Sequence, residues 1–148
     1  MTAKILIADD HGIVRQGIRS LLERQGDVEV VAEAVDGVEA LLLVRKFKPD
    51  VVIVDAGMPN FNGMEATRRM LKEFPGTKIV TLSERSCEGF VKAMFEVGIC
   101  GYILKDGLFG ELIGAIRTVL EGGIYLSPGI TGIEVDDYVK HLAEDSKI

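Results

Sequence analysis

The chain has 148 residues, of which 47% are hydrophobic and 27% charged, and its formal net charge is −6. This length suits one domain with a substantial core, and the composition excludes disordered and fibrous proteins. No apolar run approaches the roughly 20 residues of a membrane span, and an acidic chain without a basic stripe is unsuited to direct contact with DNA phosphates.

Five short β-rich runs alternate with longer segments of helical period. We expect strands at residues 4–8, 28–34, 51–54, 78–82 and 101–104. The first, third and fourth runs lack alternation between apolar and polar residues. Such runs are typical of strands that are covered on both faces in a parallel sheet.

The segments between these runs are amphipathic at helical spacing. Ile13, Ile18 and Leu22 mark the first segment, and Asp36 is placed to cap the second. Prolines or Gly98 end the later segments, where helices should stop. Strand and helix in regular alternation predict one domain built on an open, doubly wound α/β sheet with right-handed crossovers.

Polar side chains stand at the carboxyl ends of four predicted strands. Asp9 and Asp10 follow the first, Asp55 the third, Ser83 the fourth and Lys105 the fifth. Ligands of such sheets bind beyond the carboxyl ends of the strands. Three carboxylates in one pocket favour a hard cation such as Mg²⁺, and a carboxylate can act as a nucleophile toward phosphorus while an ammonium group neutralises charge.

Each of these residues also has a simpler interpretation. Two acids after a strand often cap the next helix, a single acid before a turn is usually a turn residue, and a lone lysine is usually solvated. The argument for a site is that all four strand ends carry suitable groups. We assign no role to His11 or His141.

Four motifs carry a family resemblance: ILIADDH at 5–11, DAGMPNFNG at 55–63, VTLS at 80–83 and GYILKD at 101–106. Together they resemble the receiver domain of bacterial two-component response regulators, over residues 4–128. The resemblance implies a flavodoxin-like, five-stranded parallel sheet of order 2-1-3-4-5 with five flanking helices. It also implies phosphorelay signalling, in which the domain accepts a phosphoryl group and slowly loses it but turns over no free substrate.

The resemblance assigns a phosphoacceptor and a metal site. It makes Asp55 the residue that accepts the phosphoryl group from a sensor histidine kinase. Asp9 and Asp10 become the acidic pair that binds Mg²⁺, together with Asp55 and the main-chain carbonyl of Gly57.

The same resemblance assigns the residues that respond to the phosphoryl group. Lys105 would bind it, and Ser83 with Tyr102 would form the switch pair. Pro59 and Gly63 would shape the loop after the acceptor. The apolar run at 51–54 is followed, after Asp55, by a glycine and a proline, and an active-site loop then explains this change.

Three further features are most similar to the LuxR-like (NarL/FixJ) class, namely DDH at 9–11, KD at 105–106 and GGIYLSP at 122–128. Regulators of that class carry a C-terminal helix-turn-helix domain, whereas about twenty residues follow Pro128 here. We expect residues 1–128 to be the receiver domain and residues 129–148 a linker or docking helix. The chain is either the regulatory part of a DNA-binding transcriptional regulator, which the subclass favours, or a stand-alone receiver.

The implied partners are a sensor histidine kinase and either the protein's own output domain or a second receiver in a homodimer. Direct contact of this chain with DNA or a membrane is not expected. The first residues lack the layout of a signal peptide, and Cys87 and Cys100 stand in no metal-ligand spacing. These features favour a cytoplasmic protein with reduced thiols.

Two other classes of protein are weighed against this interpretation. A phosphohydrolase with an aspartate nucleophile needs a second acid two positions further on, and Gly57 stands there. A nucleotide-binding module needs a glycine-rich phosphate loop after its first strand, whereas GLFGELIG at 107–114 follows the fifth.

The fourth predicted helix carries an unusually wide apolar arc. The arc is wider than a single core-facing stripe requires, and it consists of Phe90, Val91, Met94, Phe95 and Val97. We therefore expect part of this arc to reach the surface, where phosphorylation would be reported to a partner as the Tyr102 ring turns inward.

Overall fold

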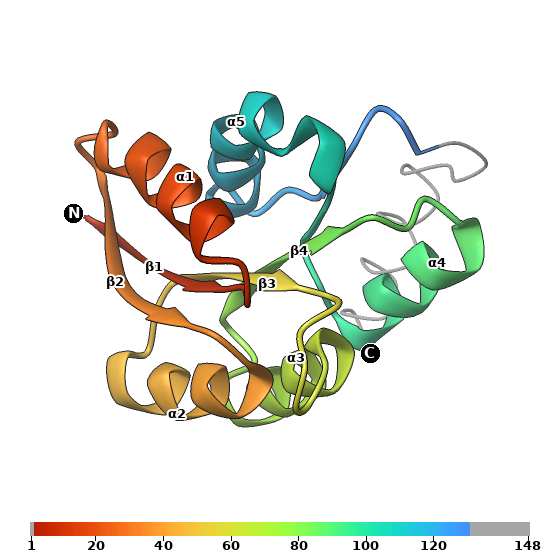
Figure 1. The fold of residues 1–148 in the computed structure, drawn as a ribbon, viewed down its shortest axis with the longest axis horizontal. Coiled ribbons are helices and arrows are strands. Elements are labelled where there is room, and N and C mark those ends of the chain that lie inside the picture. The colour runs from red at the N-terminus through yellow and green to blue at the C-terminus, as the bar shows by residue number, and fades with distance from the viewer. Residues whose placement is uncertain (1, 131–148) are drawn as a thin grey trace.

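A parallel sheet organises residues 2–130, the part of the chain that the computed structural model describes (Figure 1). The strands are β1 (Ala3–Ala8), β2 (Val28–Ala34), β3 (Val51–Asp55), β4 (Lys78–Ser83), β5 (Gly101–Leu104) and β6 (Tyr125–Leu126). Their order is β2-β1-β3-β4-β5-β6, and all five pairings are parallel. The predicted doubly wound fold and the order of its first five strands are confirmed.

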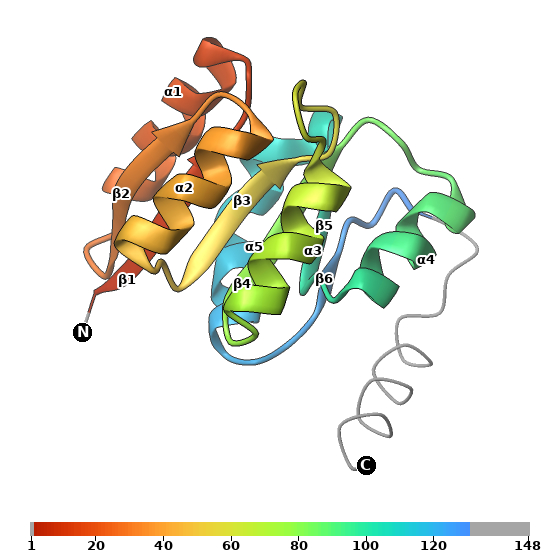
Figure 2. The same cartoon turned by 90° about the horizontal axis from the view of Figure 1, so that it is seen from below.

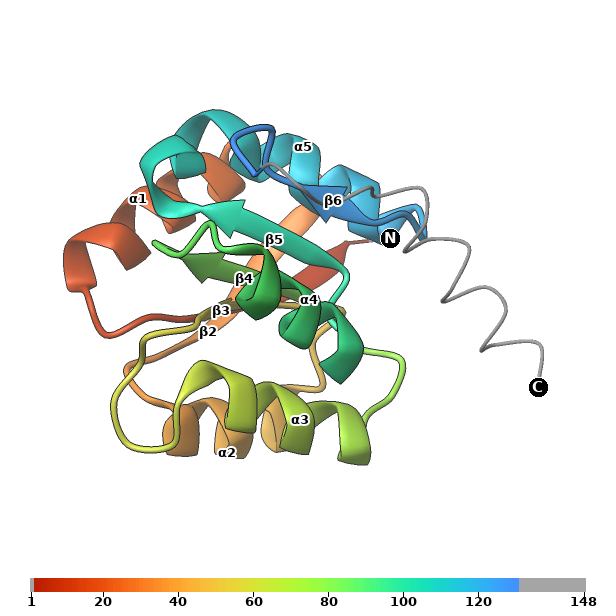
Figure 3. The same cartoon turned by 90° about the vertical axis from the view of Figure 1, so that its right-hand side faces the viewer.

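Five α-helices and one short 3-10 turn connect the strands. They are α1 (Gly12–Glu23), α2 (Gly37–Phe47), α3 (Gly63–Glu73), α4 (Glu88–Val97), η1 (Lys105–Gly107) and α5 (Leu108–Leu120). Helices α1 and α5 cover one face of the sheet, while α2 and α3 cover the other and α4 lies beside β5 (Figures 1 and 3). Figure 2 shows α2, α3 and α4 along that second face.

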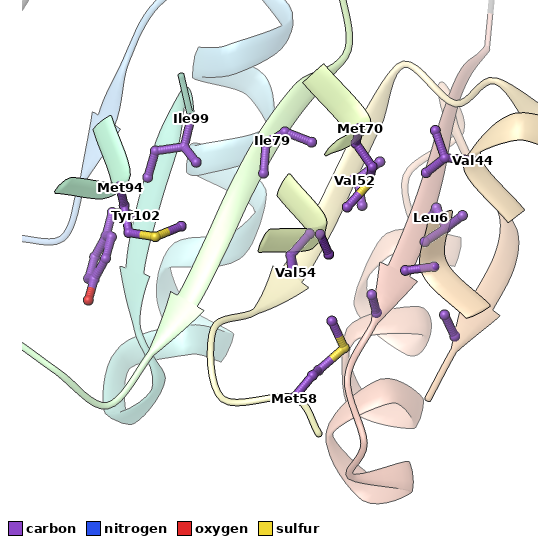
Figure 4. Close-up of a cluster of buried hydrophobic side chains, with 14 of the residues drawn as sticks. Leu6, Val44, Val52, Val54, Met58, Met70, Ile79, Met94, Ile99 and Tyr102 are labelled. Carbon is purple, nitrogen blue, oxygen red and sulfur yellow. The ribbon is translucent and has the colours of Figure 1, made fainter. Parts of the chain in front are cut away.

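Burial on both faces of the sheet explains the continuous apolar runs. Every residue of β3 is buried, and its side chains alternate between two core clusters. Val52 and Val54 face α2 and α3, together with Leu6 and Ile79 of the neighbouring strands (Figure 4). Val51 and Ile53 face α1 and α5. A strand in this position cannot carry a polar face until it leaves the sheet, which β3 does at Asp55.

Side chains cap two of the helices that lead away from the sheet. The Asp36 carboxylate accepts a hydrogen bond from the main-chain N–H of Glu39 at the start of α2, as predicted. Asn62 does the same for Glu65 at the start of α3. Helix α4 ends at Gly98, whose φ of 119° is in the left-handed region that favours glycine.

A sixth strand corrects the predicted count of five. Tyr125 and Leu126 of β6 pair with Gly101 and Tyr102 of β5. Two residues are too few to show any periodicity, so sequence patterning could not identify this strand.

Side-chain hydrogen bonds fasten β6 to its neighbours. The Glu111 carboxylate accepts from the Tyr125 hydroxyl at 2.8 Å and from the Ser127 hydroxyl at 2.5 Å. The Ser127 oxygen in turn accepts from the main-chain N–H of Leu104 at 2.8 Å. This network joins α5, the end of β5 and the segment that follows β6.

The Glu111 contact predicts how Tyr125 titrates. Burial, the hydrogen bond to Glu111 and that residue's negative charge raise the pKa of Tyr125 to about 12. Because the folded state then holds the phenol proton more tightly than the unfolded state, this stabilisation is complete below about pH 10 and is lost as the pH rises to about 12. Phenolate absorbance of wild type minus Tyr125→Phe should show the late titration. Glu111→Gln should move it back toward pH 10, and an unchanged curve in that variant would contradict the contact.

The apolar residues of the helices differ in their exposure. On α4, Val91, Met94 and Phe95 are buried, whereas Phe90 and Val97 are half-buried, so only this one edge of the apolar arc reaches the surface. Ile13, which has the helical spacing of the buried Ile18 and Leu22, is 86% exposed. Within residues 2–130, large exposed apolar side chains are found on α1, α2 and α5, and at Val35, the residue before Asp36.

The predicted helix at residues 129–148 falls almost wholly on residues 131–148, which lie outside the described part. Within residues 2–130, no helix combines the length and the apolar character needed to cross a bilayer.

Candidate functional site

The predicted polar residues converge at the carboxyl edge of the sheet. Asp9 directly follows β1, Asp55 is the last residue of β3, Ser83 is the last of β4, and Lys105 directly follows β5. Asp55, Ser83 and Lys105 line an open cavity of about 540 Å³, and His11 lines it as well. The sheet order brings these groups together because β1 and β3 are neighbours and β4 and β5 continue from β3.

Three carboxylates and one imidazole form a tight cluster at this edge. Ligand atoms of Asp9, Asp10, His11 and Asp55 all lie within 4.8 Å of one another. Asp9 and Asp55 are 0% and 1% exposed, whereas Asp10 and His11 face solvent. The Oδ1 atom of Asp9 accepts from the main-chain N–H of His11 at 2.8 Å. Its Oδ2 atom is buried and has no hydrogen-bond partner among residues 2–130.

The electrostatics of Asp9 are unusual for a carboxyl group. Burial raises its pKa above the ordinary value, and the negative charge of Asp55 adds to this rise. Hydrogen bonds from His11 and the charge of Lys105 act in the opposite direction but do not cancel it. A buried carboxylate with a free oxygen is the kind of group that a cation stabilises.

Lys105 supplies the positive charge of the site. Its Nζ atom lies 3.0 Å from Asp55 Oδ2, and the side chain is 19% exposed. Burial disfavours the ammonium form, but the hydrogen bond and charge of Asp55, with the charge of Asp9, outweigh burial and raise the pKa of Lys105. The amine is therefore cationic throughout the physiological range.

The loop after Asp55 is held by close main-chain packing. The N–H of Gly57 donates to Asp55 Oδ1 at 2.9 Å. A Cβ on Gly63 would lie 2.6 Å from the Asp55 carbonyl oxygen, and one on Gly37 would lie 1.8 Å from the carbonyl oxygen of Phe61. Only glycine fits at these two positions, so the loop is fixed between α2 and α3. The contact at Gly37 gave no signal in the sequence, because the two residues are far apart in the chain.

The Ser83 and Tyr102 side chains meet the same residue, Arg85. Ser83 Oγ accepts from the main-chain N–H of Arg85 at 3.0 Å, and the Tyr102 hydroxyl donates to the Arg85 carbonyl at 2.6 Å. The Tyr102 ring packs edge-on against Phe90, with ring centroids 6.3 Å apart. It is 0% exposed, and burial raises its pKa. The ring is thus already turned inward, so the expected inward rotation is not available to this conformation.

Two residues beside the site were not identified from the sequence. His11 received no role, yet its ring borders the three carboxylates. Arg15 was not considered, yet its guanidinium donates to the main-chain carbonyl of Asp9 at 2.7 Å and ion-pairs with Glu33. The adjacency of His11 to Asp9 and Asp10 was a usable signal, whereas the position of Arg15 depends on the packing of α1 against β2.

Comparison with known families identifies the family to which this fold belongs. The family described as "Response regulator receiver domain" matches residues 5–117 of the chain. The chain belongs to this family. The receiver match includes the acidic residues after β1, the loop after Asp55, and Lys105.

Receiver domains of longer proteins are similar to this one in sequence. It is 37% identical over 144 residues to "Transcriptional regulatory protein DegU" of Brevibacillus brevis, and 41% identical over 144 residues to "Oxygen regulatory protein NreC" of Staphylococcus carnosus (strain TM300). The alignments cover 97% of this receiver chain but 61% and 66% of those two proteins. The chain therefore spans less than two thirds of their length.

Solved structures of receivers superpose closely. A LuxR-family two-component response regulator from Aurantimonas sp. SI85-9A1 is 36% identical and gives a TM-score of 0.82 over the whole of both chains. The isolated REC domain of RcsB from Salmonella enterica serovar Typhimurium, in the presence of phosphomimetic BeF3-, is 28% identical. Its TM-score is also 0.82, over 88% of this receiver and 97% of that chain.

Proposed function

We propose that this receiver domain accepts a phosphoryl group on Asp55. The observation that carries the proposal is the position of the Asp55 carboxylate. It is buried at the end of β3, between the acidic residues after β1 and the ammonium group of Lys105 at 3.0 Å. A carboxylate oxygen of Asp55 would form a bond to phosphorus as the bond from phosphorus to a donor's histidine nitrogen breaks. Lys105 would neutralise charge on the transferring group.

The acidic cluster fits a magnesium ion. Its donors are carboxylate oxygens, which hard cations prefer, and the buried Oδ2 of Asp9 lacks a hydrogen bond from the described residues. Asp9, Asp10 and Asp55, with the main-chain carbonyl of Gly57, would hold the ion. Mg²⁺ supplies positive charge next to the transferring phosphoryl group. Receiver domains in general bind Mg²⁺ at such a group of aspartates, which supports the same choice.

Ser83 and Tyr102 would report the modification through Arg85. A phosphoryl oxygen on Asp55 offers the Ser83 hydroxyl a new acceptor, and a shift of Ser83 disturbs its contact with the Arg85 main chain. The Arg85 carbonyl also holds the Tyr102 hydroxyl, so both side chains respond to one loop movement. The free energy available to change the surface cannot exceed the difference between the interaction free energies of the phosphoryl group in the two states.

The receiver would act as the regulatory part of a DNA-binding transcriptional regulator. One relative is described as a transcriptional regulatory protein, and the aligned relatives extend well beyond the length of this chain. Residues 1–128 would be the receiver, and the residues after Pro128 would lead to an output domain. A sensor histidine kinase would donate the phosphoryl group. The same site chemistry would also serve a stand-alone receiver that acts through protein contacts. We propose a cytoplasmic location in both cases.

The test of the proposal is phosphorylation by a small donor. Incubated with acetyl phosphate and Mg²⁺, the protein should gain one phosphoryl group per chain, and chelation of Mg²⁺ should prevent the gain. Acetyl phosphate should not be hydrolysed faster than the phosphorylated protein itself decays. Rapid steady turnover without a phosphorylated intermediate would favour the phosphohydrolase, against which Gly57 already argues.

Lys105→Gln should separate metal binding from phosphoryl transfer. Removing the ammonium group 3.0 Å from Asp55 removes a competing cation, so Mg²⁺ affinity should stay the same or rise. Phosphorylation should slow by roughly 100-fold, the usual effect of deleting one group that stabilises developing charge. Titration calorimetry and the rate with acetyl phosphate measure the two effects. Lys72→Gln, at an exposed lysine of α3, is the control and should change neither; loss of Mg²⁺ binding in Lys105→Gln would contradict the assignment.

A further inference from the structure

The imidazole of His11 lies close to all three carboxylates of the site. Its Nδ1 atom lies 3.1 Å from Asp9 Oδ1, 3.3 Å from Asp10 Oδ1 and 3.9 Å from Asp55 Oδ2. The side chain is 61% exposed, so solvent reaches it from the cavity. Neither the proposed magnesium site nor the proposed phosphoryl transfer uses this imidazole.

One buried oxygen of the same cluster has unused bonding capacity. Asp9 Oδ2 is buried and accepts no hydrogen bond from the described residues, whereas Asp55 Oδ2 is paired with Lys105 at 3.0 Å. Asp55 Oδ2 faces the cluster, since it lies between the imidazole of His11 and the ammonium group of Lys105. Three carboxylates and one ammonium group leave two negative charges, which a divalent cation balances.

The spacing and the donor types suit a zinc ion. Zinc binds imidazole nitrogen and carboxylate oxygen at about 2.0–2.2 Å in a tetrahedron, so neighbouring ligand atoms lie about 3.3–3.5 Å apart. The three distances from His11 Nδ1 bracket this value. Magnesium, in contrast, prefers oxygen ligands and retains waters, and so makes little use of an imidazole.

We propose that Asp9, Asp10, His11 and Asp55 form a zinc site that overlaps the magnesium site and blocks phosphorylation. The second part of this proposal, the block of phosphorylation, rests on the function proposed above. Four protein ligands complete a tetrahedral zinc centre, and such a closed centre leaves no position for a phosphodonor. Because Asp55 is itself one of the four ligands, its carboxylate is no longer free to attack phosphorus. The site would thus distinguish the two metals through a single side chain, His11.

Metal affinity tests the site directly. Zn²⁺ affinity is measured by competition with a chromophoric chelator in wild type and His11→Gln, and Mg²⁺ affinity by calorimetry in both. All variants carry Cys87→Ser, because an exposed thiol is itself a zinc ligand. Loss of one ligand should weaken Zn²⁺ binding by about 100-fold or more and Mg²⁺ binding far less.

The matched control is His141→Gln, the same substitution at the chain's other histidine. It should leave Zn²⁺ affinity within about twofold of wild type, well below the effect of a lost ligand. If His11→Gln binds Zn²⁺ as tightly as this control, the contact of His11 with Asp9 is only a hydrogen bond and the zinc site does not exist.

Phosphorylation tests the block. With acetyl phosphate and constant Mg²⁺, added Zn²⁺ should stop phosphoryl acceptance in wild type, whereas His11→Gln should retain most of its own zinc-free rate at the same Zn²⁺ concentration. Equal inhibition of the two proteins, or phosphorylation supported by Zn²⁺ itself, would overturn the block. A wild-type protein that accepts no phosphoryl group with Mg²⁺ alone would contradict the proposed function and the block, while the zinc affinities would still decide the site.

Discussion

Asp55→Asn should abolish phosphoryl acceptance and leave the fold intact. The amide oxygen of asparagine can still accept the hydrogen bond that Gly57 donates at 2.9 Å, so the loop keeps its anchor. The amide is not a nucleophile at neutral pH, and it removes one of three clustered negative charges. Intact mass after incubation with acetyl phosphate and Mg²⁺ should show no added group, and thermal unfolding should show a folded protein.

The matched control for this substitution is Asp106→Asn, an exposed aspartate next to Lys105. It makes the same chemical change close to the site but outside the acidic cluster, and it should be phosphorylated at nearly the wild-type rate. Full labelling of the Asp55→Asn protein would show that another residue accepts the phosphoryl group.

Gly63→Ala should strongly destabilise the protein and impair the site with it. The new methyl group would lie 2.6 Å from the Asp55 carbonyl oxygen and 2.7 Å from Ala56 Cα. Both neighbours are main-chain atoms of the segment that positions the acceptor, so they cannot move aside as a flexible side chain would. Overpacking of this kind costs roughly 2–3 kcal/mol of unfolding free energy, which exceeds the gain of at most about 1 kcal/mol from replacing a helical glycine by alanine.

Gly114→Ala isolates the helix-propensity contribution. Gly114 lies within α5, and a Cβ there would meet nothing within 4 Å. This variant should gain roughly 0.5–1 kcal/mol. Chemical denaturation of both variants measures the difference, and a stabilised Gly63→Ala protein would contradict the close packing of the loop against Asp55.

The sheet and most of the site could be predicted because they depend on local rules. β3 is buried on both faces, so its sequence is apolar throughout, and the first polar residue after it marks the edge of the sheet. Parallel strands carry their carboxyl ends to one edge, so the sequence places Asp9, Asp55 and Ser83 at that edge. Which of these strands are neighbours follows from the strand order that the family resemblance implies.

The features that could not be predicted depend on contacts between distant parts of the chain. β6 is two residues long and is held by Glu111 of α5, so no periodic pattern marks it. Ile13 has the spacing of a core residue, but its position near the start of α1 leaves it in solvent. The buried ring of Tyr102 contacts Phe90 and hydrogen-bonds Arg85, which lie 12 and 17 residues earlier in the chain.

Chemical trapping of the phosphorylated residue tests the central claim most directly. Borohydride reduces an aspartyl phosphate to homoserine, which stays in place when the phosphoryl group is lost. After phosphorylation with acetyl phosphate and Mg²⁺, reduction and proteolysis, mass spectrometry of the peptides should find homoserine at position 55, with Asp9 and Asp10 unchanged. Homoserine at either of those acids, or at no position in a protein that has gained a phosphoryl group, would contradict the assignment of Asp55.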